Sequence, residues 1–191
     1  MQSITGVILA GGMGRRMDNR DKGLVVYKNK PLIEHAIGIL QPQVDDCLII
    51  ANRSHDTYRA YGHRVIPDVV SGYQGPLVGM ASGLQAALTD WVVFIPCDEP
   101  YLPTDLVKRL SLSIANSGAN LAVAHDGHRL HPVVSLVHVS LLPALLSSIQ
   151  NNHLKLQRWF DEQRAAVVDF SDCPECFVNI NTQADLEKLS T

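Results

Sequence analysis

Short runs of apolar and β-branched residues alternate along the chain with longer segments in which apolar residues recur at helical spacing. Several of the short runs are apolar throughout, as expected of strands that helices cover on both faces. We predict strands over residues 4–9, 47–51, 91–95, 121–124, 133–137 and 166–170, and a further short strand before Asp68. We predict helices over residues 31–40, 54–61, 77–88, 104–116, 140–151 and 156–163, and a last helix after Asn181-Thr182.

This alternation predicts a three-layer α/β/α sandwich around a mainly parallel sheet. One segment interrupts the pattern: Asp126-Gly127 is a tight-turn signal between two predicted strands, so an antiparallel hairpin is expected there. Thr104 is the expected cap of the helix that follows it, and Thr182 with Asp185 forms an expected capping box. The 191 residues carry no repeat or long linker, and one domain over residues 1–191 is expected.

Composition narrows the classes of function. Apolar residues make up 46% of the chain, charged residues 18%, and the formal net charge is −3 with both signs mixed along the sequence. We therefore expect no general attraction to nucleic acid or to an anionic membrane. The first apolar run stops at Gly11, too short to cross a bilayer, and no basic segment precedes it. A cytoplasmic protein with four reduced cysteines is the expectation.

The first predicted strand runs into the sequence LAGGMGRRM at residues 9–17, and Asp21-Lys22 follow. Glycines let the backbone approach a ligand, and their N–H groups can bind phosphate oxygens, while Arg15, Arg16 and Lys22 supply cations. The P-loop pattern is absent, and Met17 stands where a dinucleotide-binding fingerprint would have its third glycine. The segment therefore favours a polyphosphate ligand, the alternative being a glycine-rich turn with solvated basic residues.

Two aspartates follow predicted strands at the edge of the sheet where ligands of open α/β folds bind. Asp98 comes directly after the apolar run at residues 91–97, and Mg²⁺ takes one or two carboxylates together with water and substrate phosphates. Asp98 is therefore the expected metal ligand, although an aspartate there could also start a turn or cap a helix. Asp68 leads into a small, turn-rich loop and could accept hydrogen bonds from a nucleotide or simply belong to that turn.

Other motifs favour structural roles. Cys173 and Cys176 form a Cys-x-x-Cys pair, but no second pair completes a structural zinc site. The three histidines at three-residue spacing around Asp126-Gly127 are expected in a hairpin, with a metal site as the minor alternative. Gly75, Gly79 and Gly83 are expected to give close helix–sheet contact or loop flexibility. No base that would activate Cys97 as a nucleophile is evident beside it.

The motifs together resemble a known family. LAGG with Arg16-Met17 and Asp21-Lys22 is similar to nucleotidyltransferases with a Rossmann-like fold. Within that group the chain resembles bacterial molybdenum cofactor guanylyltransferases over nearly its whole length. The further matching segments are Pro67-Asp68, Gly75-Pro76-Leu77, Pro96-Cys97-Asp98, His131-Pro132 and FVNINT at residues 177–182.

The resemblance implies transfer of GMP from GTP to the terminal phosphate of molybdenum-loaded molybdopterin, with release of pyrophosphate and with Mg²⁺ as cofactor. It implies nucleotide contacts from Lys22, Asp68, Asp98 and the strand-end residues Leu9, Ala10, Gly11 and Gly12. Asp98 would also bind Mg²⁺, and Lys22 and Arg16 would stabilise the departing pyrophosphate. Asn179 and Asn181 would help to hold the pterin. Among the hairpin histidines, His131 is expected to face that substrate.

Two departures from the family pattern concern the nucleotide side. Met17-Asp18 stands where the family usually has Met-Gly, and Ile50 stands where relatives can carry a nucleotide-contacting asparagine. Asn52, two residues later, is the candidate replacement for the missing polar contact. Expected protein partners are the molybdenum insertion enzyme and molybdoenzyme chaperones, and a monomer is the default. A CTP-dependent sibling enzyme and a catalytically silent GTP-binding carrier stay open as alternatives.

Overall fold

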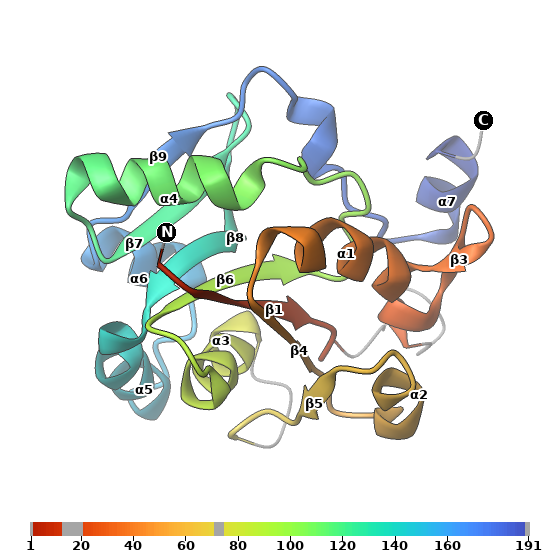
Figure 1. Ribbon diagram of the computed structural model, residues 1–191, viewed down its shortest axis with the longest axis horizontal. Coiled ribbons are helices and arrows are strands. Elements are labelled where there is room, and N and C mark those ends of the chain that lie inside the picture. Colours follow the sequence, from red (N-terminus) through yellow and green to blue (C-terminus); the bar gives the residue numbers. More distant parts are fainter. Residues whose placement is uncertain (1, 13–20, 71–74, 190–191) are drawn as a thin grey trace.

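A seven-stranded sheet forms the centre of the computed structural model, which describes residues 2–12, 21–70 and 75–189 (Figure 1). The strand order is β5-β4-β1-β6-β8-β7-β9. The bounds are Ile4–Leu9 for β1, Asp46–Ile50 for β4, Arg64–Ile66 for β5, Trp91–Pro96 for β6, Leu121–His125 for β7, Leu130–His138 for β8 and Ala166–Asp169 for β9.

The sheet is mainly parallel, as predicted. β5, β4, β1 and β6 run parallel to one another, and β9 runs parallel to β7. Only β8 runs against its neighbours β6 and β7 among the strands of this sheet that the structure describes. The predicted β7–β8 hairpin is confirmed: Gly127 has φ of 92°, a conformation that glycine adopts without strain.

Helices cover both faces of the sheet, which confirms the three-layer architecture (Figure 1). α1 and α4 lie on one face, and α3, α5 and α6 lie on the other. The bounds are Leu32–Leu40 for α1, His55–Arg59 for α2, Pro76–Ala86 for α3, Leu106–Ser117 for α4, Leu142–Gln150 for α5, Leu156–Glu162 for α6 and Gln183–Leu189 for α7. Short 3₁₀ turns lie at Lys22–Leu24, Gln41–Gln43, Val139–Leu141 and Pro174–Phe177.

The central strands divide their side chains between two separate cores. In β6, Trp91, Val93 and Ile95 face the α1 and α4 side, whereas Val92 and Phe94 face the α3 and α5 side. This alternation follows from the two-residue period of a strand, and it explains why the sequence of β6 is apolar throughout. Both faces are buried, so neither needs polar residues.

Glycines on α3 allow the helix to pack closely on the sheet. A Cβ at Gly83 would lie 2.6 Å from a ring carbon of Phe94, and one at Gly79 would lie 3.2 Å from Leu9. Close helix–sheet contact is thus the role of these two glycines. Gly75 differs, since it precedes the helix with φ of 94°.

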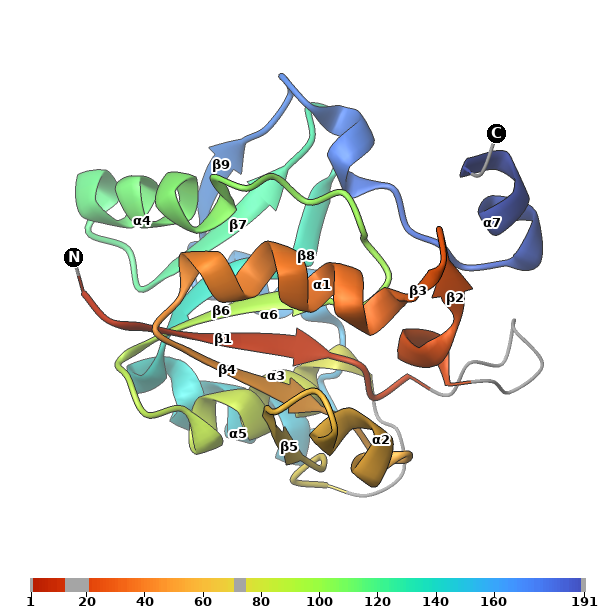
Figure 2. The ribbon, with the colours of Figure 1, turned by 45° about the vertical axis from the view of Figure 1, so that its right-hand side comes forward.

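The sequence did not predict the two-stranded hairpin of β2 (Val26–Tyr27) and β3 (Lys30–Pro31). Its turn residues Lys28 and Asn29 have φ of 45° and 64°, which a lysine seldom adopts and which propensity therefore does not suggest. The hairpin packs beside α7 (Figure 2), where Tyr27 and Leu186 belong to one small apolar cluster.

One of the two predicted helix caps is confirmed. The N–H of Asp185 donates to the Thr182 hydroxyl at 3.2 Å, and the N–H of Thr182 donates to the Asp185 carboxylate at 2.8 Å. The prediction for Thr104 was wrong, because α4 begins one residue later than a Thr104 cap requires, with Asp105 at its N-cap position. No helix in the described part of the chain is both long and apolar enough to span a membrane.

Candidate functional site

Four parallel strands end at the same edge of the sheet, and each is followed by a candidate ligand-binding residue. β1 leads into Gly11 and Gly12, β4 into Asn52, β5 into Asp68 and β6 into Asp98. In Figure 2 the arrowhead of β1 points to the side of the molecule where the β2–β3 hairpin and α7 lie. This shared direction brings together residues that are up to 87 positions apart, from Gly11 to Asp98.

Lys22 and Asp98 form an ion pair in this edge. Lys22 lies on the 3₁₀ turn after the glycine-rich segment, and its Nζ contacts Asp98 Oδ2. The same Nζ donates to Asn181 Oδ1 at 2.6 Å. Asp98 is 8% exposed, so its carboxylate is largely shielded from water and the lysine offsets its charge. Three of the predicted site residues are therefore in direct contact.

Asn179 joins this cluster from the same extended segment as Asn181. Its Nδ2 donates to Glu99 Oε1 at 2.9 Å and lies 3.5 Å from Asp98 Oδ2. The backbone N–H of Ile180, between the two asparagines, donates to the carbonyl of Asp98 at 2.9 Å. The segment that carries both asparagines is thus fastened directly to the end of β6.

Glu99 is a buried carboxyl group that sequence reasoning did not single out. It is 4% exposed, and burial raises its pKa, although the nearby His131 ring and the hydrogen bond from Asn179 oppose that shift. A glutamate directly after Asp98 and before a proline gave no signal that it would point inward. Its burial depends on the segment at residues 177–181, which is distant in sequence.

His131 lies beside Glu99, on the protein side of the cluster of Lys22, Asp98 and Asn179, and is 6% exposed. Its Nε2 is 2.8 Å from Asp126 Oδ2, its Nδ1 is 3.9 Å from Glu99 Oε1, and its ring packs on Phe177. Burial alone would lower the pKa of His131, but the contacts with Glu99 and Asp126 outweigh it and raise that pKa. Direct contact between His131 and a pterin stays a prediction, and the described contacts of the ring are with protein groups.

Asp68 and Gly11 meet at Asn52. The Nδ2 of Asn52 donates to Asp68 Oδ2 at 2.7 Å and lies 3.4 Å from the carbonyl of Gly11. The Asn52 Oδ1 accepts from the backbone N–H of Asp68 at 3.0 Å. Burial raises the pKa of Asp68, and the hydrogen bond from Asn52 opposes that shift. The structure therefore brings the ends of β1, β4 and β5 together through one amide side chain.

The remaining predicted residues lie at the end of β1 or outside the described residues. The N–H of Ala10 donates to Ile50 and the carbonyl of Leu9 accepts from Cys97, so both continue the sheet ladder. A Cβ at Gly12 would meet nothing within 4 Å, which leaves open space above that backbone. Arg16, with Arg15, Met17 and Asp18, falls in a segment that the structure does not describe, and its role stays a prediction.

Asp21 is held by groups that the sequence did not connect to it. The hydroxyl of the fully buried Tyr58 donates to Asp21 Oδ1 at 2.5 Å, and Arg53 Nε lies 3.6 Å from Asp21 Oδ2. Arg53 also reaches the carbonyl of Gly12 at 3.4 Å. These contacts hold the 3₁₀ turn of Lys22 against α2, so the backbone that carries the Lys22 side chain is fixed in position.

The cysteines do not form a nucleophilic or metal centre in the described part of the chain. Cys97 is buried beside the site, and burial raises the pKa of its thiol well above the usual range. Burial, followed by the hydrogen bond with Cys173, raises the pKa of Cys176 to about 11. No three His, Cys, Asp or Glu side chains among the described residues are arranged to hold a metal ion by themselves.

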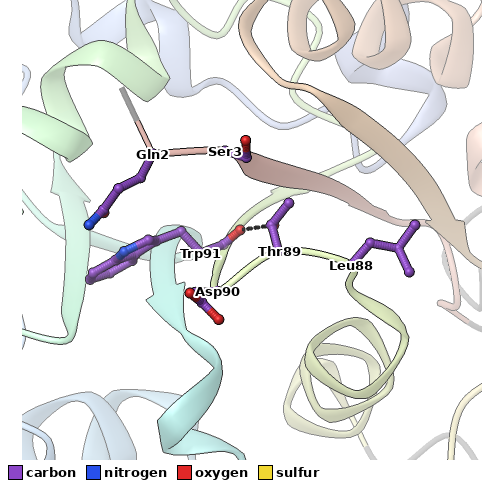
Figure 3. Close-up of a pocket in the computed structure, with 6 residues that line it drawn as sticks. All are labelled: Gln2, Ser3, Leu88, Thr89, Asp90 and Trp91. Atoms are coloured by element: carbon purple, nitrogen blue, oxygen red, sulfur yellow. Dashed lines mark hydrogen bonds between the residues drawn. The ribbon is translucent and has the colours of Figure 1, made fainter.

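A hollow of about 260 Å³ lies at the opposite edge of the sheet (Figure 3). Its lining includes Gln2, Ser3 and Leu88, and the Thr89 hydroxyl there donates to the carbonyl of Trp91 at 2.8 Å. Trp91 starts β6, whereas Asp98 follows its end, so this hollow lies at the amino ends of the strands. It is separate from the convergent polar residues described above.

Comparison with known proteins agrees with this geometry. Residues 6–167 match the family described as MobA-like NTP transferase domain. The molybdenum cofactor guanylyltransferase of Shewanella halifaxensis is 44% identical over 186 residues, covering 97% of this chain and 93% of that protein. The protein of the same name from Pasteurella multocida is 43% identical over 185 residues, covering 97% and 98% respectively.

The fold comparison gives the same result at lower sequence similarity. The crystal structure of molybdopterin-guanine dinucleotide biosynthesis protein A from Archaeoglobus fulgidus superposes with a TM-score of 0.79 and 20% identity, covering 97% of this chain and 96% of that one. At that identity the likeness shows the fold. Together with the full-length sequence matches, it places this chain in the MobA-like NTP transferase family.

Proposed function

We propose that this chain transfers GMP from GTP to the terminal phosphate of molybdenum-loaded molybdopterin, producing a guanine dinucleotide cofactor and pyrophosphate. The observation that carries the proposal is the contact of Lys22, Asp98 and Asn181 at the sheet edge, in a chain 44% identical to a guanylyltransferase over nearly its whole length. A cation, a carboxylate and an amide that meet at the sheet edge where parallel strands end suit a polyphosphate and its counterion.

The acceptor chemistry requires little from the protein. A phosphate monoester has a second pKa of about 6, so the attacking oxygen is already ionised near neutral pH. The Cys97 thiol stays protonated because its pKa is raised by burial, which fits a reaction without a covalent intermediate. The chain then has to align two substrates and compensate charge on the leaving pyrophosphate. Lys22 would supply that charge, with Arg16 as its proposed companion.

The donor set fits Mg²⁺ of the kind that arrives with a nucleotide. Asp98 supplies a carboxylate at the end of β6, and Mg²⁺ commonly takes one or two carboxylates while substrate phosphates and water fill the other positions. Asp98 would hold the ion, whose chemistry is to offset charge at the phosphates. Lys22 contacts the same carboxylate, so the proposed phosphate-binding cation and the proposed metal ligand lie side by side.

The substrates divide the site into two halves. Asp68, Asn52 and the end of β1 form the proposed nucleotide half, and Asn179 and Asn181 form the proposed pterin half, with Lys22 and Asp98 between them. Reaction in the cytoplasm, and handover of the product to a molybdenum insertion enzyme or a molybdoenzyme chaperone, stay proposals that follow from the proposed substrates.

Pyrophosphate release tests the proposed function directly. Purified protein would be incubated with Mg²⁺ and each nucleoside triphosphate, with and without intact molybdenum-loaded molybdopterin. We expect release that requires both the pterin and GTP. Release with CTP would instead assign the chain to the CTP-dependent sibling activity, and GTP binding without any release would favour a carrier role.

Two substitutions test the charged centre. We expect Lys22→Ala and Asp98→Ala each to reduce kcat at least about 100-fold, because each removes charge that the transferring phosphates need. Lys30→Ala and Asp56→Ala are matched controls, since both side chains are exposed, and wild-type rates are expected for them. Wild-type rates in folded Lys22→Ala or Asp98→Ala protein would refute the assigned roles.

A further inference from the structure

Asn52 makes a two-sided contact with Asp68. Its Nδ2 donates to the carboxylate Oδ2 at 2.7 Å, while its Oδ1 accepts from the backbone N–H of the same residue at 3.0 Å. A carboxylate and an N–H group fix which end of the amide faces which partner, because the carboxylate only accepts and the N–H only donates. Asn52 therefore restricts both the position and the rotation of the Asp68 carboxylate.

Asn52 also lies against the backbone of the glycine-rich segment. Its Nδ2 is 3.4 Å from the carbonyl oxygen of Gly11, and a Cβ added to Gly11 would approach this Nδ2 to 3.1 Å. A side chain at Gly11 would thus press on the amide that orients Asp68. Glycine at this position lets the end of β1 come close to the end of β5.

Asn52 binds only one of the two carboxylate oxygens of Asp68. Oδ1 is buried, and it has no hydrogen-bond partner among the residues that the structure describes. A buried carboxylate oxygen without a donor is costly, and such groups in folded proteins call for a ligand or water to satisfy them. A Cβ added at Gly79 would lie 3.5 Å from Oδ1. The same Cβ would also contact Leu9 and Ile50, so both of these apolar side chains lie near this oxygen.

We infer that Asn52 is a positioning residue for nucleotide binding: it holds Oδ2 of Asp68 so that Oδ1 stays directed at one hydrogen-bond donor of the bound nucleotide. The inference rests on the proposed function in taking that nucleotide as GTP. Guanosine offers two kinds of donor, the N–H groups of the base and the hydroxyl groups of the ribose. In either case a neutral N–H or O–H group donates a hydrogen bond to the carboxylate.

The side chain at position 50 explains why this task falls to Asn52. Ile50 is 1% exposed and belongs to the core on the α3 side, so it offers no polar atom to a ligand or to Asp68. Asn52 lies just beyond the end of β4, where it is partly exposed and can reach both neighbouring strand ends. Its action on the nucleotide is indirect, through Asp68.

A double-mutant cycle tests this coupling. The Kd of GTP and the KM and kcat of pyrophosphate release would be measured for wild type, Asn52→Ala, Asp68→Ala and the double variant. We expect Asn52→Ala to raise Kd and KM about tenfold with kcat changed less than about twofold, since one hydrogen bond to a charged group is disturbed. In the Asp68→Ala background, Asn52→Ala should have no further effect on Kd.

Controls separate coupling from general damage to the fold. Asn116→Ala, at an exposed position on α4, is expected to behave as wild type. Thermal unfolding of every variant is measured in parallel, and Asn52→Ser replaces Asn52→Ala if the latter unfolds below the assay temperature. Effects of Asn52→Ala and Asp68→Ala that multiply in the double variant would overturn the inference, as would unchanged GTP binding by Asn52→Ala.

Deoxy nucleotides identify the donor. If the loss of affinity in Asn52→Ala disappears with 2′-deoxy-GTP or 3′-deoxy-GTP, Oδ1 serves a ribose hydroxyl, and if it persists with both, Oδ1 serves the base. Failure of the proposed function gives a different result. Wild type would then release no pyrophosphate from GTP and the pterin, whether or not it binds GTP, whereas failure of the inference alone leaves wild type active and Asn52→Ala unaffected.

Discussion

Replacing Asp126 removes the partner of a buried histidine and so tests how the β7–β8 hairpin supports the site. Asp126 Oδ2 lies 2.8 Å from His131 Nε2, and Oδ1 accepts from the backbone N–H groups of His128 and Arg129, both at 2.7 Å. The proposed perturbations are Asp126→Ala, which removes all three contacts, and Asp126→Asn, which keeps the shape and removes the charge.

The three contacts of Asp126 contribute unequally to the free energy of unfolding. The two turn N–H groups are in an exposed turn and regain hydrogen bonds to water after truncation, whereas His131 is 6% exposed and does not. A hydrogen bond to a charged group contributes about 1.5–3 kcal/mol, and an unpaired buried charge costs about 3–5 kcal/mol. Asp126 is covered by its own turn at the protein surface, so water screens the pair in part, and we expect about 3 kcal/mol for Asp126→Ala.

For a chain of this length, each kcal/mol lowers Tm by about 2–4 °C. Asp126→Ala should therefore lower Tm by about 6–12 °C, and Asp126→Asn, at about 1 kcal/mol, by about 2–4 °C. The control is Asp56→Asn, whose side chain is 98% exposed although it pairs with Arg59. Exposed ion pairs contribute about 0–1 kcal/mol, so little change in Tm is expected for the control.

The pH dependence gives the sharper test. His131 has a raised pKa in the folded protein, so its share of the stability is present below its unfolded pKa of about 6.5 and is lost as pH rises through the folded value. Asp126 has a lowered pKa, caused by His131 and the turn N–H groups against the opposing effect of burial. The stability that Asp126 contributes to the fold is present above about pH 4 and is lost as the pH falls.

The difference in unfolding free energy between wild type and Asp126→Asn should thus be largest between about pH 4 and 6.5 and should shrink at alkaline pH. Urea unfolding at several pH values measures it. The groups that face His131 are Asp126 and Glu99, and Arg129 lies 3.9 Å from Asp126, so these charges set the profile. A difference that stays constant from pH 5 to pH 9, or an Asp126→Ala variant as stable as wild type, would refute this reasoning.

Three further predictions concern packing, capping and thiol reactivity. Gly83→Ala should destabilise the fold by about 1–3 kcal/mol in urea unfolding, because the new Cβ would lie 2.6 Å from Phe94, and wild-type stability would contradict the close helix–sheet contact. Asp185→Ala should cost about 1 kcal/mol and increase proteolysis near the end of the chain, because it removes the capping box with Thr182, and an unchanged cleavage rate would count against that role. Cys176, with a pKa of about 11, should react with iodoacetamide at pH 7.5 far more slowly than free cysteine, and a rate equal to that of free cysteine would show that the thiol is not shielded.

Much of the sheet could be predicted from local pattern. β6 is a continuous apolar run ended by a proline, and β1 is a mostly apolar run followed by glycines; both patterns favour a buried parallel strand. The hairpin at Asp126-Gly127 and the capping box of Thr182 with Asp185 were likewise predicted, because each depends on residues only a few positions apart. The β2–β3 hairpin was missed, since its turn uses a lysine at positive φ.

The candidate site was predictable only as separate positions. The sequence singled out Lys22, Asp68, Asp98 and the two asparagines at 179 and 181, partly from residue chemistry and partly from family resemblance. Local pattern alone could not indicate that Lys22 contacts both Asp98 and Asn181, which lie 76 and 159 residues away. Contacts of that separation depend on the order of the strands, which no local periodicity encodes.

What the sequence determined by itself is the strands of the main sheet and the helices that cover it, the direction of the main strands and the residue types at their ends. These follow from short-range physics: side-chain period, turn geometry and the burial of apolar runs. Only the tertiary structure decided which polar groups became buried and which partners they found. Glu99 and His131 became interior groups, and Asn52 became the link between Gly11 and Asp68, because packing across the sheet sets burial and pairing, and both depend on residues far apart in the chain.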